Sequence, residues 1–107
     1  MNNNHAHNHE FIGSSKFVNQ FGNSHNHRFI GITTSVIKMT NGSHYHKFST
    51  DTDYYKDHFH MLVGQTGEAI EVGEGKHIHF INSRTTLCNG HVHCITFTTL
   101  IDNPIEN

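Results

Sequence analysis

In the stretch His77-Ile78-His79-Phe80-Ile81, two histidines and an isoleucine occupy every second position, namely 77, 79 and 81. Successive side chains of a β-strand point to opposite faces, so both histidines and Ile81 would share one face of a strand. On an α-helix, residues two apart diverge by about 200°, and these three side chains would not lie together. The stretch therefore predicts a strand that presents two histidines and one apolar residue on the same side.

The same His-x-His pair occurs six times along the chain, each time with an apolar residue two positions later. The pairs are His7/His9, His25/His27, His44/His46, His58/His60, His77/His79 and His91/His93. The apolar residues that follow them are Phe11, Phe29, Phe48, Leu62, Ile81 and Ile95. We expect each pair to lie on a strand with its apolar residue on the histidine face.

The spacing of the pairs indicates an internal repeat. His27, His60 and His93 follow one another at intervals of 33 residues, and glycine and threonine positions between the pairs keep the same offset. His9 and His46 are 37 residues apart, so the first copy carries four extra residues, which we place in a loop around residues 19–24. The chain therefore reads as three copies of one unit, each with two His-x-His strands.

These features predict an all-β fold made of three β-hairpin repeats of ~33 residues with pseudo-threefold symmetry. Asn41-Gly42, Gly73-Glu74-Gly75 and Asn89-Gly90 are typical turn sequences between strands. We expect the repeats to close as a barrel or prism, or in a trefoil-like manner. Residues 1–107 are expected to form a single domain, with residues 1–4 and 102–107 as tails.

The hairpin register leaves two arrangements of the histidines open. In the first, the two pairs of one repeat face each other, so that His44 and His46 would meet His58 and His60, and the third repeat would do the same. This arrangement needs a loop with an odd number of residues. It would build one four-histidine group within a repeat.

In the second arrangement, Asn89-Gly90 forms a two-residue type I′ turn with Cys88 opposite His91. That register would place His93 opposite Thr86 and His79 opposite Leu100, with the two pairs of the repeat on opposite faces. Equivalent histidines of the three repeats would then meet on an axis. The expected sets are His27, His60 and His93, and His25, His58 and His91.

Imidazole is a common ligand of Zn²⁺, Cu²⁺ and Ni²⁺, so we expect a histidine-rich, non-catalytic protein that binds one of these metals. The candidate ligands are His7, His9, His25, His27, His44, His46, His58, His60, His77, His79, His91 and His93. Glu71 and Glu74 are candidates to orient a ligand ring, and Cys88 is a better candidate ligand than Cys94, which we expect to be packed. The alternative is that the histidines only fill half-buried strand faces.

Composition limits the other functions. The chain has 107 residues, a formal charge of −2 and no run of basic residues, so we expect neither a nucleic-acid nor a membrane partner. Its hydrophobic fraction of 34% favours self-association into a homo-oligomer or homopolymer, for which the strand His5-Ala6-His7-Asn8-His9 is a candidate contact. This alternative function is that of a self-assembling structural protein, such as a spore-surface or filament subunit.

An enzyme is not expected. Three histidines around a metal with an open position would permit metal-assisted hydrolysis, but no residue is identified as a general base and no phosphate loop is present in the sequence. Two cysteines are too few for a disulfide framework. The N-terminus resembles neither a signal peptide nor a membrane span, so the cytoplasm is the default location, and the spore or cell surface stays open.

Several segments together resemble the YmaF-like family of small proteins from Gram-positive, spore-forming bacteria. The segments are His25-Asn26-His27-Arg28-Phe29, residues 67–73, Gly75-Lys76-His77-Ile78-His79-Phe80, Gly90-His91-Val92-His93 and Thr99-Leu100-Ile101-Asp102. The resemblance covers most of residues 7–105. It implies a bacterial source and a histidine-patterned fold, and it supplies no activity and no catalytic residues.

Overall fold

The computed structural model describes residues 6–20 and 23–103, and within them every regular element is a β-strand. Of the tails expected at residues 1–4 and 102–107, residues 1–4 and 104–107 lie outside the described residues. The all-β fold class is confirmed. The strands are β1 (Glu10–Ser14), β2 (Val18–Gln20), β3 (Asn23–His25), β4 (Arg28–Ile32), β5 (Ile37–Lys38), β6 (His44–Tyr45), β7 (Lys47–Asp51), β8 (Met61–Gln65), β9 (Ala69–Gly73), β10 (Lys76–Arg84) and β11 (Cys94–Thr98).

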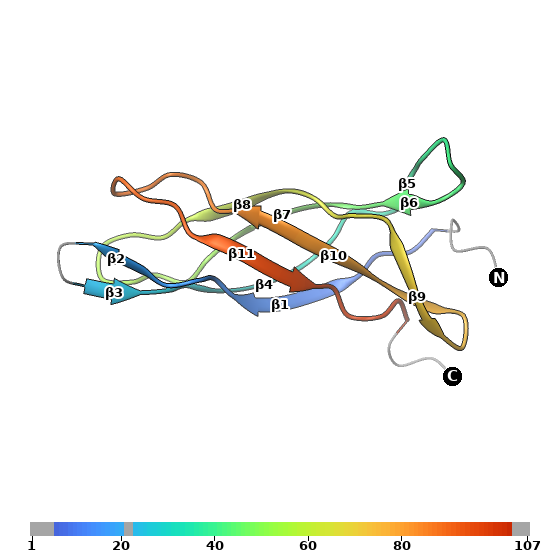
Figure 1. Ribbon diagram of the computed structural model, residues 1–107, viewed down its shortest axis with the longest axis horizontal. Coiled ribbons are helices and arrows are strands. Elements are labelled where there is room, and N and C mark those ends of the chain that lie inside the picture. The colour runs from blue at the N-terminus through green and yellow to red at the C-terminus, as the bar shows by residue number, and fades with distance from the viewer. Residues whose placement is uncertain (1–5, 21–22, 104–107) are drawn as a thin grey trace.

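Three antiparallel strand pairs form the middle of the molecule: β1 with β4, β7 with β8, and β10 with β11 (Figure 1). Smaller pairs lie at the two ends. The β2–β3 pair lies at one end, and the β5–β6 and β9–β10 pairs lie at the other. The molecule is therefore elongated, with extents of 51 × 29 × 17 Å.

The three central pairs are held to one another by a few main-chain hydrogen bonds at their edges. Two bonds join β1–β4 to β7–β8, from Thr34 N to Lys47 O and from Asp53 N to Arg28 O. Corresponding bonds join the other neighbours. They run from Gly67 N to Phe80 O, Thr86 N to Met61 O, Lys16 N to Cys94 O and Leu100 N to Glu10 O. Because the strands meet at isolated bonds and not along continuous ladders, the described residues form five small sheets, and the closed barrel we expected is not found.

The core consists of the six apolar residues that the alternation singled out. Phe11, Phe29, Phe48, Leu62, Ile81 and Ile95 are all buried and pack against one another. Glycines make room for the larger rings, because a Cβ built on Gly31 would lie 2.5 Å from Phe11 Cζ. This predicted strand face is confirmed as the inside of the molecule.

The turn at Asn89-Gly90 is confirmed, but the register beyond it differs from both arrangements drawn from the sequence. Cys88 pairs with His91 across this turn, and both turn residues have positive φ angles of 53° and 79°. Further along, Arg84 pairs with Cys94. Residues 85–87 on one side of the hairpin thus face residues 92–93 on the other. The first segment is one residue longer than the second, so the hairpin contains a β-bulge.

The bulge shifts the register of the third repeat by one residue. Thr85 N donates to His93 O, and Thr99 N donates to His79 O. The expected pairings of His93 with Thr86 and of His79 with Leu100 are therefore wrong. Because side-chain direction alternates along a strand, the shift turns both histidine pairs of the repeat inward and not to opposite faces.

The other two hairpins carry the same irregularity. Residues 52–54 face residues 59–60 between the pairs Asp51/Met61 and Tyr55/His58. Residues 15–17 face residues 26–27 between Ser14/Arg28 and Val18/His25. The β2–β3 pair, in which residues 18–20 face residues 23–25, lies in the region where we expected the four extra residues of the first copy.

Candidate metal sites

The twelve paired histidines form two groups, one toward each end of the molecule. Cluster I consists of the first pair of each predicted repeat: His7, His9, His44, His46, His77 and His79. Cluster II consists of the second pair of each predicted repeat: His25, His27, His58, His60, His91 and His93. Cluster II lies at the β2–β3 end, and cluster I lies at the end with β5, β6 and β9 (Figure 1). The six-residue apolar core separates the two clusters along each strand.

This arrangement decides between the alternatives left open by the sequence. The pairs of one repeat do not meet, so the four-histidine group of His44, His46, His58 and His60 is wrong. Equivalent histidines of different repeats do meet. The ring centroids of His27, His60 and His93 lie 4.7–4.8 Å apart, and those of His25, His58 and His91 lie 5.0–5.1 Å apart.

Each cluster has an inner layer of three histidines next to the core and an outer layer of three. The inner layers are His9, His46 and His79 in cluster I and His27, His60 and His93 in cluster II. All six inner side chains are at most 1% exposed. Of the outer histidines, His7 alone is not fully buried among the described residues, so the paired histidines are interior groups and not a half-buried surface stripe.

A hydroxyl group fixes the backbone of every inner histidine. In cluster I, the amide of His46 donates to Thr66 Oγ1 at 3.1 Å, and that of His79 donates to Thr99 Oγ1 at the same distance. In the remaining four cases the acceptors are the hydroxyls of Thr33, Ser15, Thr52 and Thr85. These buried hydroxyls hold the inner rings in place at the end of each central strand.

A carbonyl group of a neighbouring strand pair orients every inner ring. His9 Nδ1 donates to Leu100 O at 2.9 Å, and His46 Nδ1 donates to Thr34 O at 2.8 Å. The other four rings do the same with Gly67 O, Asp53 O, Thr86 O and Lys16 O. A carbonyl oxygen only accepts, so Nδ1 carries the proton, and the Nε2 atom of a neutral ring keeps its lone pair.

The Nε2 atoms face the middle of each cluster. Those of His46, His79 and His93 are buried and have no hydrogen-bond partner among the described residues. In cluster I, Nε2 of His77 lies 3.0 Å from Nε2 of His7 and 3.0 Å from that of His9. All six cluster I donors lie within 4.8 Å of one another, and so do those of cluster II apart from His60, so either cluster can hold a metal ion.

Burial keeps these rings neutral. Desolvation, together with neighbouring imidazoles, lowers the pKa of His9, His44 and His93 to about 4 and that of His79 to about 3. The pKa values of His25, His46, His60 and His77 are also lowered, mainly by burial. Neutral imidazole is the form that binds a metal, so the clusters are ready as ligands at neutral pH.

Carboxylates orient some outer rings. Asp102 Oδ1 lies 3.2 Å from His77 Nδ1, and Asp57 Oδ1 lies 3.5 Å from His58 Nδ1. Asp102, which we expected in a tail, is 2% exposed and accepts the amide of His77. Asp102 was not predictable from the sequence, because its place beside His77 depends on a contact between residues 25 apart. Of Glu71 and Glu74, the expected orienting residues, Glu71 lies opposite His77 on β9, and its charge opposes the lowering of the pKa of that ring.

The two cysteines lie outside both clusters. Each is a free thiol, and neither belongs to a group of metal-ligating atoms among residues 6–20 and 23–103. Cys94 is exposed, so the expectation that it is packed is wrong. Cys88 pairs with His91 through its backbone only.

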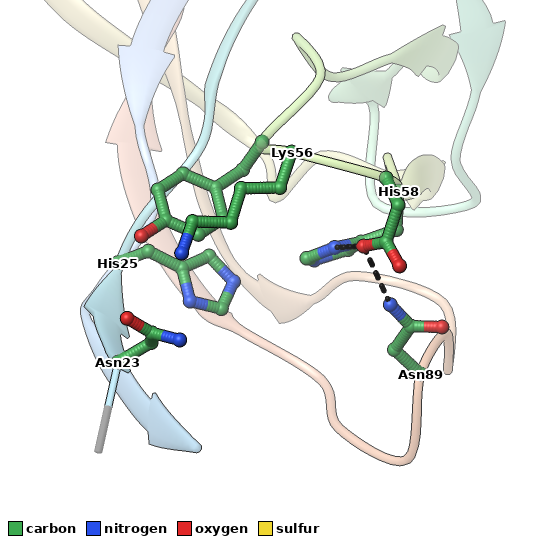
Figure 2. A pocket seen from close by; sticks show the side chains of 7 residues that line it. Asn23, His25, Lys56, His58 and Asn89 are labelled. Atoms are coloured by element: carbon green, nitrogen blue, oxygen red, sulfur yellow. Dashed lines mark hydrogen bonds and ion pairs between the residues drawn. The ribbon is translucent and has the colours of Figure 1, made fainter. Parts of the chain in front are cut away.

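Cluster II borders a surface pocket. The pocket is lined by Asn23, His25, Tyr55, Lys56, Asp57, His58 and Asn89. Figure 2 shows His25 and His58 on opposite sides of this space, with Asn23 and Asn89 below them. Tyr55 stacks on His25 with ring centroids 4.3 Å apart, and Asn89 Nδ2 donates to Asp57 Oδ1, which in turn faces His58.

The model of the YmaF family, described as spore germination protein GerY/YamF, matches residues 4–101. No curated protein and no solved structure matches the chain. Over the described residues, the structure holds no helix with the length and apolar character needed to span a membrane.

Proposed function

The chain belongs to the YmaF family of spore germination proteins, and we propose that it is a metal-binding protein whose two histidine clusters each hold one divalent transition-metal ion. Zn²⁺, Cu²⁺ and Ni²⁺ are the ions to test first, because all three accept imidazole ligands. The proposal makes the twelve paired histidines ligands and assigns no catalytic residue.

The pair His9 and His77 carries this proposal. Their Nε2 atoms lie 3.0 Å apart, while His9 Nδ1 donates to Leu100 O and His77 Nδ1 faces the carboxylate of Asp102. His77 Nδ1 makes no hydrogen bond within the described residues, so a proton placed there, toward the carboxylate, would leave two Nε2 lone pairs facing each other. A bound cation between them would satisfy both lone pairs.

Two pairs in cluster II have a similar arrangement. His27 Nδ1 donates to Asp53 O and His58 Nδ1 faces Asp57, yet their Nε2 atoms are 3.2 Å apart. The Nε2 atoms of His60 and His91 lie 3.1 Å apart, with His60 Nδ1 donating to Thr86 O. The recurrence at both ends supports one ion in each cluster.

We also propose that the three repeats are related by an approximate threefold axis through both clusters. The ring-to-ring distances support this, since the inner rings of cluster I are 4.5–4.7 Å apart and those of cluster II 4.7–4.8 Å apart. The paired hydrogen bonds between neighbouring strand pairs support it too. Such an axis explains why one ion can be reached from all three repeats.

Titration of the chelator-stripped protein with ZnCl₂, CuCl₂ and NiCl₂ tests the metal proposal. We expect heat of binding, about two ions per chain at saturation, and a higher melting temperature, because an ion that binds only the folded state stabilises it. The absence of both heat and thermal shift with all three ions would overturn the proposal.

Two double variants locate the ions. His44→Gln with His77→Gln removes two outer ligands of cluster I, and His58→Gln with His91→Gln does the same in cluster II. Each is expected to retain one tightly bound ion per chain by elemental analysis. Tyr45→Phe with Ile78→Val, at positions between the histidines of their pairs, is the matched control and should retain two.

The description of the family bears on where the proposed metal binding would occur. We propose that the protein binds its metal in the spore, since spore germination is what the description of the family names. Immunodetection in fractionated spores and growing cells would test this. Detection in growing cells but in no spore fraction would contradict it.

Self-assembly is a second candidate function, and an exposed apolar surface favours it. Ile12 and Ile30 pair across β1 and β4 on the outer face and are 62% and 67% exposed, and Val63 on β8 is 57% exposed. Apolar residues gathered on a surface are typical of protein contacts. His7 and His9 belong to cluster I of their own chain, so the surface, and not the N-terminal strand, supports this candidate.

Sedimentation velocity with and without metal tests self-assembly, and a monomer at high concentration in both conditions would rule it out.

A further inference from the structure

We propose that each cluster binds its ion with all six imidazoles as a closed octahedron, which fits six-coordinate ions such as Ni²⁺, Co²⁺ and Fe²⁺ and leaves no position for water or substrate. This inference rests on the proposed metal binding and specifies its coordination. It departs from a three-histidine site with an open position, the arrangement that would permit hydrolysis.

The ring contacts in cluster I have the connectivity of an octahedron. Among the described residues, each ring makes edge contacts with four of the five other rings of its cluster. The pairs without contact are His7 with His79, His9 with His44, and His46 with His77. Each joins an inner ring to an outer ring, as expected for opposite corners of an octahedron made from two staggered triangles.

Cluster II has the same connectivity. Its contacts again leave out one partner for every ring within the described part of the chain. The opposite pairs are His25 with His60, His27 with His91, and His58 with His93. Two clusters formed by different residues thus share one pattern of ring contacts, although the donor atom of His60 lies outside the cluster II group in which all donors are within 4.8 Å of one another.

The distances between donor atoms fit a metal ion at the centre. Adjacent corners of an octahedron are about 1.4 times as far apart as a corner is from the centre. The Nε2 separations of 3.0–3.2 Å therefore correspond to a metal–nitrogen distance of about 2.1–2.3 Å, close to the ~2.0–2.1 Å of zinc–imidazole bonds. Opposite donors would then be about 4.2–4.5 Å apart, within the 4.8 Å limit that holds for all of cluster I.

The number and kind of donors decide which ions fit. Zn²⁺ in structural sites takes four ligands almost always, and Cu²⁺ prefers a tetragonal arrangement, so neither uses six equal imidazoles well. Mg²⁺, Ca²⁺ and Mn²⁺ prefer oxygen donors. Fe²⁺, Co²⁺ and Ni²⁺ accept both nitrogen donors and six-fold coordination. A filled shell also keeps the ion from binding a further ligand.

Anaerobic titration of the chelator-stripped full chain with CoCl₂ tests this coordination, because the visible spectrum of Co²⁺ reports its coordination number. We expect two Co²⁺ per chain with the weak, pink absorption of six-coordinate Co²⁺, and no spectral change when thiocyanate is added. An intense blue spectrum, or a change on adding thiocyanate, would overturn the octahedral inference and leave the metal-binding function standing. No uptake of Co²⁺, Ni²⁺, Zn²⁺ or Cu²⁺ would overturn both.

A single-ligand variant adds an independent readout. His44→Gln opens one corner of cluster I, so thiocyanate should now change the spectrum of about half of the bound Co²⁺. Tyr45→Phe, at the neighbouring position, is the matched control and should behave as the unaltered protein. A His44→Gln protein that binds two Co²⁺ and stays unresponsive to thiocyanate would contradict the closed octahedron.

Discussion

Asp102 holds His77 at two points: its Oδ1 accepts the backbone amide at 2.9 Å and lies 3.2 Å from the ring Nδ1. Burial raises the pKa of Asp102, but the amide of His77 and the adjacent ring outweigh burial, and the net pKa is lowered. The carboxylate is therefore ionised at neutral pH. Its charge favours a proton on His77 Nδ1, which would leave Nε2 to bind a metal in cluster I.

Replacement of this carboxylate should weaken cluster I. Asp102→Asn keeps the size of the side chain but removes the charge, and loss of such an orienting partner typically lowers metal affinity by about 10–100-fold. We expect this loss at one of the two ions, measured by competition with a chromophoric chelator. Asp51→Asn, an exposed position on β7, is the control. Equal affinities in the two variants would show that Asp102 does not orient a ligand.

Mild acid should destabilise the metal-free protein. The unfolded histidines have a pKa near 6.5, whereas the folded values are lowered to about 4 for His9, His44 and His93 and to about 3 for His79. Between these limits the unfolded chain binds more protons than the folded chain. Stability is therefore full above about pH 6.5 and is lost as the pH falls toward 4.

Urea unfolding of the metal-free protein at pH 7.5, 6 and 4.5 measures this dependence. The midpoint should fall at each step, with most of the change complete before the majority of carboxylates titrate. With saturating metal, the urea midpoint should stay high until protons displace the ion from the rings. A midpoint that is constant between pH 7.5 and 4.5 would contradict the assignment of buried neutral histidines.

The buried hydroxyls should matter for stability. Thr66 Oγ1 accepts the His46 amide at 3.1 Å and donates to Gly67 O at 2.9 Å. Thr66→Val keeps the shape but leaves that buried amide without its acceptor, which costs about 1–3 kcal/mol. The free energy of unfolding in urea measures the loss. Thr98→Val on the exposed face of β11 should change it by less than about 0.5 kcal/mol, and a similar change in both variants would count against the proposed role.

Substitution of the glycines opposite the core phenylalanines should cost more stability where less space is left beside the glycine. A Cβ on Gly31 would lie 2.5 Å from Phe11 Cζ, whereas one on Gly64 would lie 3.1 Å from Phe48 Cζ. We expect Gly31→Ala to lower the free energy of unfolding by about 1–3 kcal/mol and Gly64→Ala to lower it by less. The reverse order in a thermal or urea melt would show that the ring of Phe11 moves away easily.

Much of the fold follows from local alternation. The period of two in His77-Ile78-His79-Phe80-Ile81 is a property of a single strand, so it predicted the strands and the inward face without knowledge of their partners. The turn at Asn89-Gly90 was predictable for the same reason, because positive φ angles are a local preference of these residues.

The hairpin register was not predictable in this way. The bulge at residues 85–87 adds one residue to one side of the hairpin, and nothing in its composition distinguishes it from a regular strand. Its effect is nevertheless large, because a one-residue shift reverses the face of every side chain beyond it. Asp102 was missed for a related reason, since its partner His77 is brought to it by the pairing of other strands.

By itself, the sequence determined the strand face that the six apolar residues after the histidine pairs turn to the core. Alternation along one strand requires only the geometry of the polypeptide chain, and burial of the apolar residue chooses the face. The tertiary structure alone decided which pairs meet. Each strand pair sends one His-x-His pair to either end of the core, and edge hydrogen bonds between strand pairs bring equivalent rings together, so six histidines from three distant segments surround one point.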